Sequence, residues 1–234
     1  MSLTLRPGPA RGHANHGWLD TWHSFSFANY YDPAHMGFRD LRVINDDRIA
    51  AAAGFPAHGH QDMEIITYLV EGSLAHKDST GGEGVLKRGD VQAMSAGRGV
   101  KHSEFNPSQS EEARLLQIWI LPKEDGLTPA YRQKSFPDGV KENRLRLLVS
   151  GDGSDGALAV NQDIAVYASL LDEGKTLTHA LAPKRGAWLQ VVDGAVDLNG
   201  QRLHAGDGAA IENERLLTIE GRAPRSDFLL FDLP

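Results

Sequence analysis

The chain has 234 residues, of which 41% are apolar and 24% charged, a composition that excludes a disordered or fibrous protein and allows one or two domains. A net charge of −7 without a run of basic residues argues against nucleic-acid binding. The absence of cysteine excludes disulfides, thiolate nucleophiles, iron–sulfur clusters and cysteine-ligated zinc.

Neither a targeting segment nor a membrane span is expected from the sequence. Residues 1–9 lack the apolar core of a signal peptide. The longest uncharged apolar stretch, residues 49–57, contains Gly54 and Pro56 and is too short to cross a bilayer. We therefore expect a cytoplasmic protein without membrane contact.

Short runs with β-strand chemistry recur along the chain. Residues 65–70, 115–120 and 228–231 are rich in β-branched, leucine or aromatic side chains, and apolar residues alternate over residues 164–170. No helical periodicity extends beyond two turns. The sequence thus predicts an all-β protein, a sandwich or a barrel. Tight turns are expected at the Asp-Gly and Asn-Gly dipeptides at 125–126, 138–139, 152–153, 155–156, 193–194 and 199–200.

A weak internal repeat predicts two copies of one β-barrel plan. The turn EGSL at 71–74 is followed by RGDV at 88–91, and the similar turn DGAV at 193–196 is followed by AGDG at 205–208. We place the boundary in the polar stretch 123–142 and expect domains at 1–134 and 135–234. Eight of the ten histidines lie at or before position 102, so the function is expected in the first domain.

Two short motifs carry the chemistry, His58-Gly59-His60 and His102-Ser103-Glu104. Side chains at i and i+2 of a strand share a face, so each motif directs two donor groups to one side. If both strands line a barrel interior, three imidazoles and a carboxylate converge on one point. Such ligands suit Fe, Cu, Ni, Mn or Zn and leave two open positions on an octahedral ion. The alternative is that these are ordinary turn or surface histidines.

The first half of the sequence resembles the pirins, a branch of the cupin superfamily. This resemblance implies a bicupin, two stacked double-stranded β-helix (jelly-roll) barrels. It further implies one metal in the N-terminal barrel, held by His58, His60, His102 and Glu104, and a degenerate C-terminal cupin without metal. Fe(II) is the expected ion, and Cu, Ni, Mn, Co and Zn are compatible with the ligands. The motifs behind the resemblance are WHSFSF at 22–27, YYDP at 30–33, MEIITY at 63–68, KDS at 77–79 and GRGVKHSEFN at 97–106.

Similar bacterial pirins are quercetin 2,3-dioxygenases, which implies an enzyme that converts a flavonol and O2 to a depside and CO. Glu104 is then expected to double as the catalytic base. The alternative is a regulatory protein that binds a transcription factor or a metabolic enzyme and uses the metal as a structural or redox-sensing element. The modest charge and the burial of the barrels against each other predict a monomer.

Two carboxylates compete for the role of metal ligand. In the wider cupin pattern the ligand is four residues after H-x-H, here Glu64, whereas in pirins it comes from the second motif, here Glu104. The resemblance favours Glu104. Glu64, which leads into a buried strand, is then expected to be a hydrogen-bonded residue that orients a histidine. Pirins usually read His-Pro-His-Arg where this chain has Gly59 and Gln61, which leaves the charge of the pocket rim open.

Other aromatic and histidine residues are expected to be structural. Most of the aromatic run Trp18, Trp22, Phe25, Phe27, Tyr30 and Tyr31 is predicted to pack in the core, with a flat-substrate pocket as the alternative. The histidines set aside as structural or exposed are His13, His16, His23, His35 and His76, and His179 lacks a paired donor.

Overall fold

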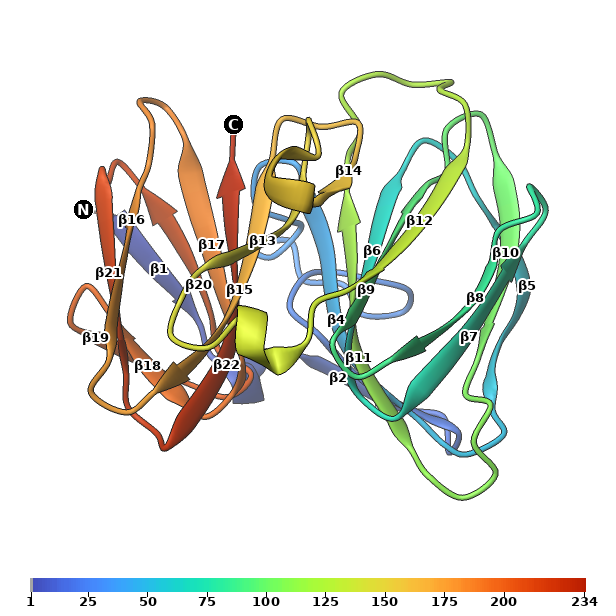
Figure 1. The fold of residues 1–234 in the computed structure, drawn as a ribbon, viewed down its shortest axis with the longest axis horizontal. Coiled ribbons are helices and arrows are strands. Elements are labelled where there is room, and N and C mark those ends of the chain that lie inside the picture. Colours follow the sequence, from blue (N-terminus) through green and yellow to red (C-terminus); the bar gives the residue numbers. More distant parts are fainter. Residues whose placement is uncertain (1) are drawn as a thin grey trace.

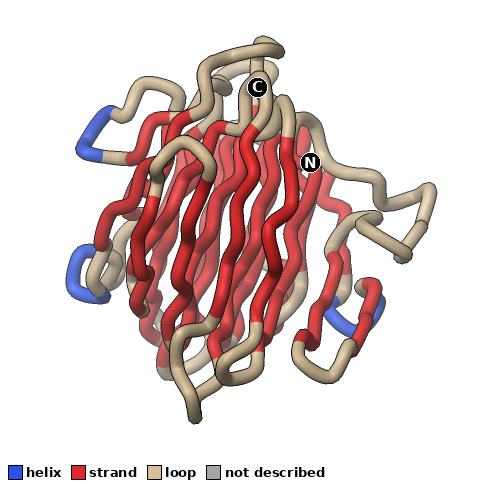
Figure 2. The backbone as a smooth tube through the Cα atoms, turned by 90° about the vertical axis from the view of Figure 1, so that its right-hand side faces the viewer, coloured by secondary structure: helices blue, strands red, loops and turns tan. Residues whose placement is uncertain are grey.

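The computed structural model describes residues 2–234 and consists almost entirely of β-strands (Figure 1). Among these residues the helices are three single-turn 3-10 segments, η1 (Gly8–Ala10), η2 (Asp138–Val140) and η3 (Ser154–Gly156). None of the helices in this part of the chain is long and apolar enough to cross a membrane. Figure 2 shows the strands running side by side, with loops gathered at their ends. The predicted all-β class is confirmed.

The first barrel, on the right of Figure 1, is built from a seven-stranded and a four-stranded sheet. In spatial order the larger sheet contains β12 (Ala130–Ser135), β9 (Asp90–Ser95), β6 (Glu64–Glu71), β11 (Ala113–Ile120), β4 (Leu41–Ile49), β3 (Leu19–His23) and β2 (Gly12–Asn15). The smaller sheet contains β5 (Gly54–His60), β10 (Val100–Phe105), β7 (Ser73–Asp78) and β8 (Glu83–Lys87).

The second barrel repeats this plan on the left of Figure 1. Its larger sheet contains β1 (Ser2–Arg6), β20 (Gly208–Glu212), β17 (Gly186–Asp193), β22 (Arg225–Leu233), β15 (Ala165–Asp172), β13 (Arg146–Ser150) and β14 (Leu158–Ala159). Its smaller sheet contains β16 (Thr176–Ala180), β21 (Leu216–Gly221), β18 (Ala195–Leu198) and β19 (Gln201–His204).

The repeat seen in the sequence reflects equivalent turns of the two barrels. Gly72 joins β6 to β7 with φ of 73°, and Gly194 joins the equivalent strands β17 and β18 with φ of 78°. Gly89 before β9 and Gly206 before β20 both have φ of 86°. Glycine is the residue that takes these positive φ values without steric cost, so the sequence retains it in both copies.

The two barrels are stacked through their larger sheets. Ile66 and Tyr68 of β6 belong to the same buried apolar cluster as Leu229 and Phe231 of β22. The strands between the barrels are therefore covered on both faces, which explains why they read as near-continuous apolar runs. The predicted bicupin architecture, two stacked jelly-roll barrels, is confirmed.

The edge strands of the larger sheets are exchanged between the two halves of the chain. β1 precedes the first barrel but pairs with β20 of the second, from Ser2↔Glu212 to Arg6↔Gly208. β12 precedes the second barrel but pairs with β9 of the first. Each exchange covers a sheet edge that would otherwise expose unpaired backbone groups. The domain boundary between residues 134 and 135 stays a prediction. Strand β1, which was expected in the N-terminal domain, lies in the larger sheet of the second barrel.

Candidate metal centre and adjoining cavity

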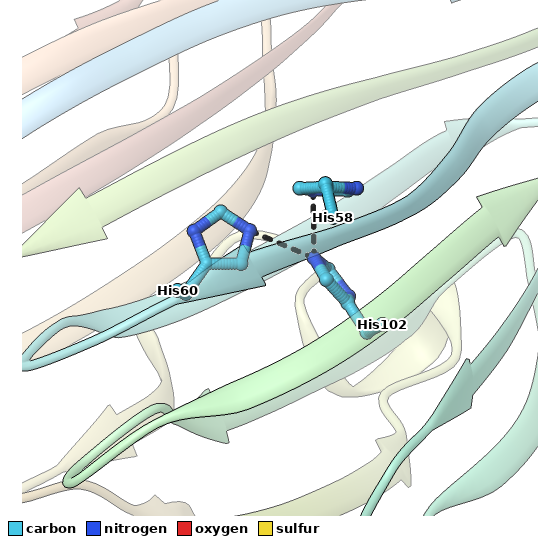
Figure 3. Close-up of side chains that lie close together, drawn as sticks. All are labelled: His58, His60 and His102. Carbon is cyan, nitrogen blue, oxygen red and sulfur yellow. Dashed lines mark hydrogen bonds between the residues drawn. The ribbon is translucent and has the colours of Figure 1, made fainter.

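Antiparallel strands β5 and β10 bring three predicted ligands together. His58 is the register partner of His102, and His60, two residues on, shares the face of His58. His102 Nε2 lies 2.9 Å from His60 Nε2 and 3.0 Å from His58 Nε2 (Figure 3). Each of the three rings thus directs its Nε2 atom toward the other two, and one ion could contact all three Nε2 atoms.

The protonation of these rings suits a cation. His58 Nδ1 lies 2.8 Å from the carbonyl oxygen of Pro56 and can donate to it, which leaves a lone pair on Nε2 facing the centre. Burial, reinforced by the neighbouring imidazoles, lowers the pKa of both His60 and His102 to about 4. These two rings are therefore neutral at neutral pH. Neutral imidazole nitrogens about 3 Å apart are a donor set that a divalent transition metal would satisfy.

The structure places Glu104 beside His102, buried on the same face of β10. Its Oε1 accepts a hydrogen bond from Gln92 Nε2 at 3.2 Å, and its Oε2 accepts one from Gln117 Nε2 at 2.8 Å. Burial opposes ionisation of this carboxyl, yet His76, His102 and the Gln92 amide together lower the pKa of Glu104 below its ordinary value. Glu104 is thus a carboxylate within reach of the imidazole cluster. Its ligand role stays a prediction.

His76, set aside in the sequence as structural, lies inside this cluster. It is 1% exposed, and its Nδ1 is 3.4 Å from His102 Nδ1. Its Nε2 is 3.0 Å from Asp78 Oδ2, and its ring stacks on Tyr131 at 4.4 Å. A metal-binding histidine is commonly oriented through its second ring nitrogen, and His76 occupies that position for His102. The signal in the sequence was the His76-x-Asp78 alternation, which resembles the other two motifs.

Glu64 is buried and hydrogen-bonded as expected, but the expectation that it orients a histidine is wrong. Ser95 Oγ donates to its Oε2 at 2.7 Å, and Asn161 Nδ2, from the second half of the chain, donates to its Oε1 at 3.0 Å. The argument from strand parity failed because β5 ends at His60 and a turn with Asp62 at φ of 48° precedes β6. Glu64 therefore faces the second barrel rather than the imidazoles.

A cavity of about 640 Å³ adjoins the three imidazoles, within the size range of small-molecule sites. His58, His60 and Glu104 contribute to its wall, and Trp119 packs edge-on against His60 with ring centroids 5.0 Å apart. Burial raises the pKa of Asp47 in the same wall to about 7, against the opposing effect of the Thr21 hydroxyl and with a smaller contribution from the charges of Asp46 and Glu104. Other residues lining the cavity are His13, Ala14, His16, Trp18, Leu19, Thr21, His23, Phe27, Ala28, Asn29, Tyr30, Asn45, Phe55 and Gln117.

The aromatic run has a mixed outcome. Trp18, Phe27 and Tyr30 line the cavity, which agrees with the alternative of a flat-substrate pocket. Phe25 packs between the barrels as expected for a core residue, whereas Tyr31 is 73% exposed. The remaining member, Trp22, is partly buried and stacks on a histidine ring.

The two departures from the usual pirin motif lie outside the cavity wall. Gly59 and Gln61 are both exposed, and they border a separate shallow depression with Ser79 and Lys101. A Cβ at Gly59 would meet its nearest atom at 3.8 Å, so no close packing requires glycine there. The substitutions therefore change an outer surface near His60 and leave the charge of the cavity wall unaltered.

Comparison with known proteins agrees with the fold and identifies the family. Residues 5–120 match the family model described as Pirin, and residues 147–233 match the model described as Quercetinase C-terminal cupin domain. The chain is 50% identical over 232 residues to a protein of Escherichia coli K12 named quercetin 2,3-dioxygenase, covering 99% of both chains. The chain belongs to the pirin family.

Other relatives of this pirin are similar over nearly their whole length. A pirin-like protein of Caulobacter vibrioides is 46% identical over 218 residues, which is 93% of this chain and 94% of the relative. The crystal structure of YhhW from Escherichia coli is 49% identical with a TM-score of 0.96, covering 100% and 98% of the two chains. A structure of YhhW in complex with nickel(II) has a TM-score of 0.95 at 48% identity, covering 100% and 99%. The predicted family is thus confirmed.

Proposed function

We propose that this pirin is a metal-dependent dioxygenase that cleaves flavonols such as quercetin with O2 to give a depside and CO. The observation that carries the proposal is a cluster of three imidazole nitrogens beside an aromatic-lined cavity, with His58 and His60 in the cavity wall. A flat ring system suits such walls, and donor groups in one wall suit a ligand with neighbouring oxygen atoms. The Escherichia coli relative named quercetin 2,3-dioxygenase supports the same assignment.

The metal would be held by His58, His60, His102 and Glu104, with Fe(II) as the proposed ion. The convergent Nε2 atoms fit a transition metal, and a relative has been solved in complex with nickel(II). When bound, the ion would supply Lewis-acid and redox chemistry to the flavonol oxygens and O2. His76 would keep the ring of His102 in its orientation through the contact between their Nδ1 atoms.

Glu104 would act as the general base. Its lowered pKa keeps the carboxyl ionised near neutral pH, so one of its oxygens can accept the proton of the flavonol 3-hydroxyl. The amides of Gln92 and Gln117 hold both oxygens in place before substrate arrives. The aromatic side chains Trp18 and Phe27 in the cavity wall would position the rings and exclude water.

The test is aerobic turnover of quercetin, followed by loss of its visible absorbance and by release of CO. We expect turnover by the purified, metal-loaded protein and its loss on treatment with a chelator. His58→Ala should lose most of the bound metal and at least 100-fold of the activity. His179→Ala is the matched control, because His179 lies in the second barrel, 2.8 Å from Asp232 Oδ2, and should retain both.

Two results would contradict the proposal at different points. Full metal occupancy in His58→Ala would overturn the ligand assignment. A metal-loaded wild-type protein that leaves quercetin intact would overturn the enzymatic function and favour a regulatory protein, whose partner a pull-down should then recover.

A further inference from the structure

The cavity wall opposite the imidazoles contains an unusual pair of polar side chains. Thr21 of β3 and Asp47 of β4 are register partners in the seven-stranded sheet, whereas the imidazoles belong to the facing four-stranded sheet. Both side chains line the cavity, at 4% and 3% exposure. Thr21 Oγ1 and Asp47 Oδ1 form no hydrogen bond of ordinary length and angle within residues 2–234, although the Thr21 hydroxyl lies close enough to lower the pKa of Asp47.

Few buried polar atoms of residues 2–234 lack a partner, and several of these belong to the cavity wall. Eight buried side-chain atoms of the described chain lack a hydrogen-bond partner, and three of them, in Thr21, Asp47 and Trp119, belong to residues of the cavity wall. The neighbouring Asn45 is satisfied, since its Oδ1 lies 2.8 Å from His23 Nδ1. A buried polar atom without a partner is costly, so its retention in a cavity indicates that a ligand completes it.

The chemistry of the pair selects a hydroxyl group. A phenolic hydroxyl donates one hydrogen bond and accepts others, so it can donate to Asp47 Oδ1 and accept from the Thr21 hydroxyl at the same time. Opposed residues on paired strands have Cβ atoms about 5 Å apart, close enough for one oxygen to reach both. The aromatic residues Phe27 and Tyr30, which also line the cavity, provide contact for the ring that carries the hydroxyl.

We propose that Asp47 and Thr21 form a recognition site for a phenolic hydroxyl, so that this pirin selects polyhydroxylated aromatic ligands. The inference rests on the proposed function, because the ligand's reacting oxygens are taken to face the imidazoles while a second hydroxyl meets the opposite sheet. Asp47 and Thr21 are then specificity residues, and neither is required to hold the metal.

The test compares two flavonols in metal-free, chelator-treated protein. Quercetin carries hydroxyls on all its rings, whereas 3-hydroxyflavone keeps only the reacting 3-hydroxyl. Binding is measured by quenching of tryptophan fluorescence, to which Trp18 and Trp119 of the cavity wall contribute. We expect wild-type protein to bind quercetin at least about 10-fold more tightly than 3-hydroxyflavone, the scale of one buried hydrogen bond to a carboxyl group.

Two variants remove one partner each. Asp47→Leu and the isosteric Thr21→Val should each weaken quercetin binding about 10-fold and leave 3-hydroxyflavone binding unchanged. Asp47→Asn, which keeps an acceptor oxygen, should restore part of the preference. Ser169→Ala is the matched control, because Ser169 Oγ is also buried without a partner but lies in the second barrel, and both affinities should stay at the wild-type values.

The outcomes separate this inference from the proposed function. An unchanged preference for quercetin in Asp47→Leu and Thr21→Val, or equal weakening of both ligands, overturns the recognition site even when turnover is normal. A preference that depends on Asp47 and Thr21 supports the site, and it does so even if the metal-loaded protein fails to cleave quercetin and the proposed function falls.

Discussion

A buried carboxyl between the barrels makes folding stability depend on pH. Asp227 is 7% exposed, and its two oxygens accept from the Tyr68 hydroxyl at 3.2 and 3.1 Å. Lys141 Nζ lies 3.2 Å from the same hydroxyl. Burial raises the pKa of Asp227 to about 6, against the opposing effects of Lys141 and Tyr68. The folded protein therefore holds this proton more tightly than the unfolded chain.

The perturbation is Asp227→Asn, which keeps the shape and removes the titration. The ordinary pKa is 3.8, so between about pH 4 and pH 6 unfolding of the wild type releases a proton from Asp227, and stability falls as pH rises. Above about pH 7 the carboxyl is ionised in both states and this contribution is constant. The shift of the Asp227 pKa from 3.8 to about 6 corresponds to a total change of about 3 kcal/mol in the free energy of unfolding. Because much of the unfolded-state carboxyl is already ionised at pH 4, we expect the stability of the variant relative to wild type to rise by about 2 kcal/mol of this total between pH 4 and pH 7.

The assay is urea unfolding of metal-free protein at pH 4, 5, 6 and 7, followed by tryptophan fluorescence. The difference between the two proteins cancels the titration of every other group and any fixed change in the hydrogen bond to Tyr68. Asp125→Asn, at an exposed position, is the control and should leave the pH dependence as in wild type. A difference between Asp227→Asn and wild type that stays constant within 1 kcal/mol would refute the reasoning, because Lys141 and Tyr68 would then fully offset the burial.

Three further predictions concern single side chains and the assembly. Glu104→Gln should reduce quercetin turnover by at least about 100-fold while the histidines retain metal. Glu64→Gln should instead lower the unfolding free energy by about 1–3 kcal/mol and leave turnover intact. If Glu64→Gln is inactive and Glu104→Gln turns over normally, Glu64 is the base. Arg114→Met should lower the unfolding free energy by about 3–5 kcal/mol in urea titrations, because Arg114 donates to both oxygens of buried Asp46 at 3.0 Å and to Asp193 at 2.8 Å. Light scattering should give the monomer mass of 25.5 kDa, and twice that value would contradict it.

Much of the fold could be predicted because its signals are local. The apolar runs at 65–70, 115–120 and 228–231 lie in β6, β11 and β22, and the Asp-Gly and Asn-Gly turns at 193–194 and 199–200 have glycines with φ of 78° and 84°. The pairing of β1 with β20 could not be predicted. Leu3 and Leu5 alternate as in any half-buried strand, and alternation carries no information about which distant edge a strand joins.

The site was predictable where strand parity holds and unpredictable where the chain turns. The register of β5 and β10 is regular from His58 to His60 opposite His102, so the i, i+2 rule placed these side chains correctly relative to one another; the register shifts only beyond His102. Glu64 follows a turn, and a turn resets which face each residue occupies. Asp47 could not have been found at all, because its importance depends on a missing hydrogen-bond partner that only the packed cavity reveals.

The two barrels differ in the side chains that equivalent strands direct into the barrel interior. β10 of the first barrel carries His102 and Glu104 on its inner face, whereas β21, its counterpart in the second, carries Leu217 and Ile219, which pack in a cluster of buried apolar side chains. Each buried leucine or isoleucine stabilises the fold by about 1.5–3 kcal/mol. The first barrel lacks this stabilisation at every position where a polar side chain or the cavity replaces an apolar side chain. The second barrel adds stability in two ways. It has an apolar core of its own, and its larger sheet packs against the larger sheet of the first barrel, which carries Asp47. Among the described residues, the groups that could hold a metal lie in the first barrel, and the second barrel contributes packing to the sheet that carries Asp47.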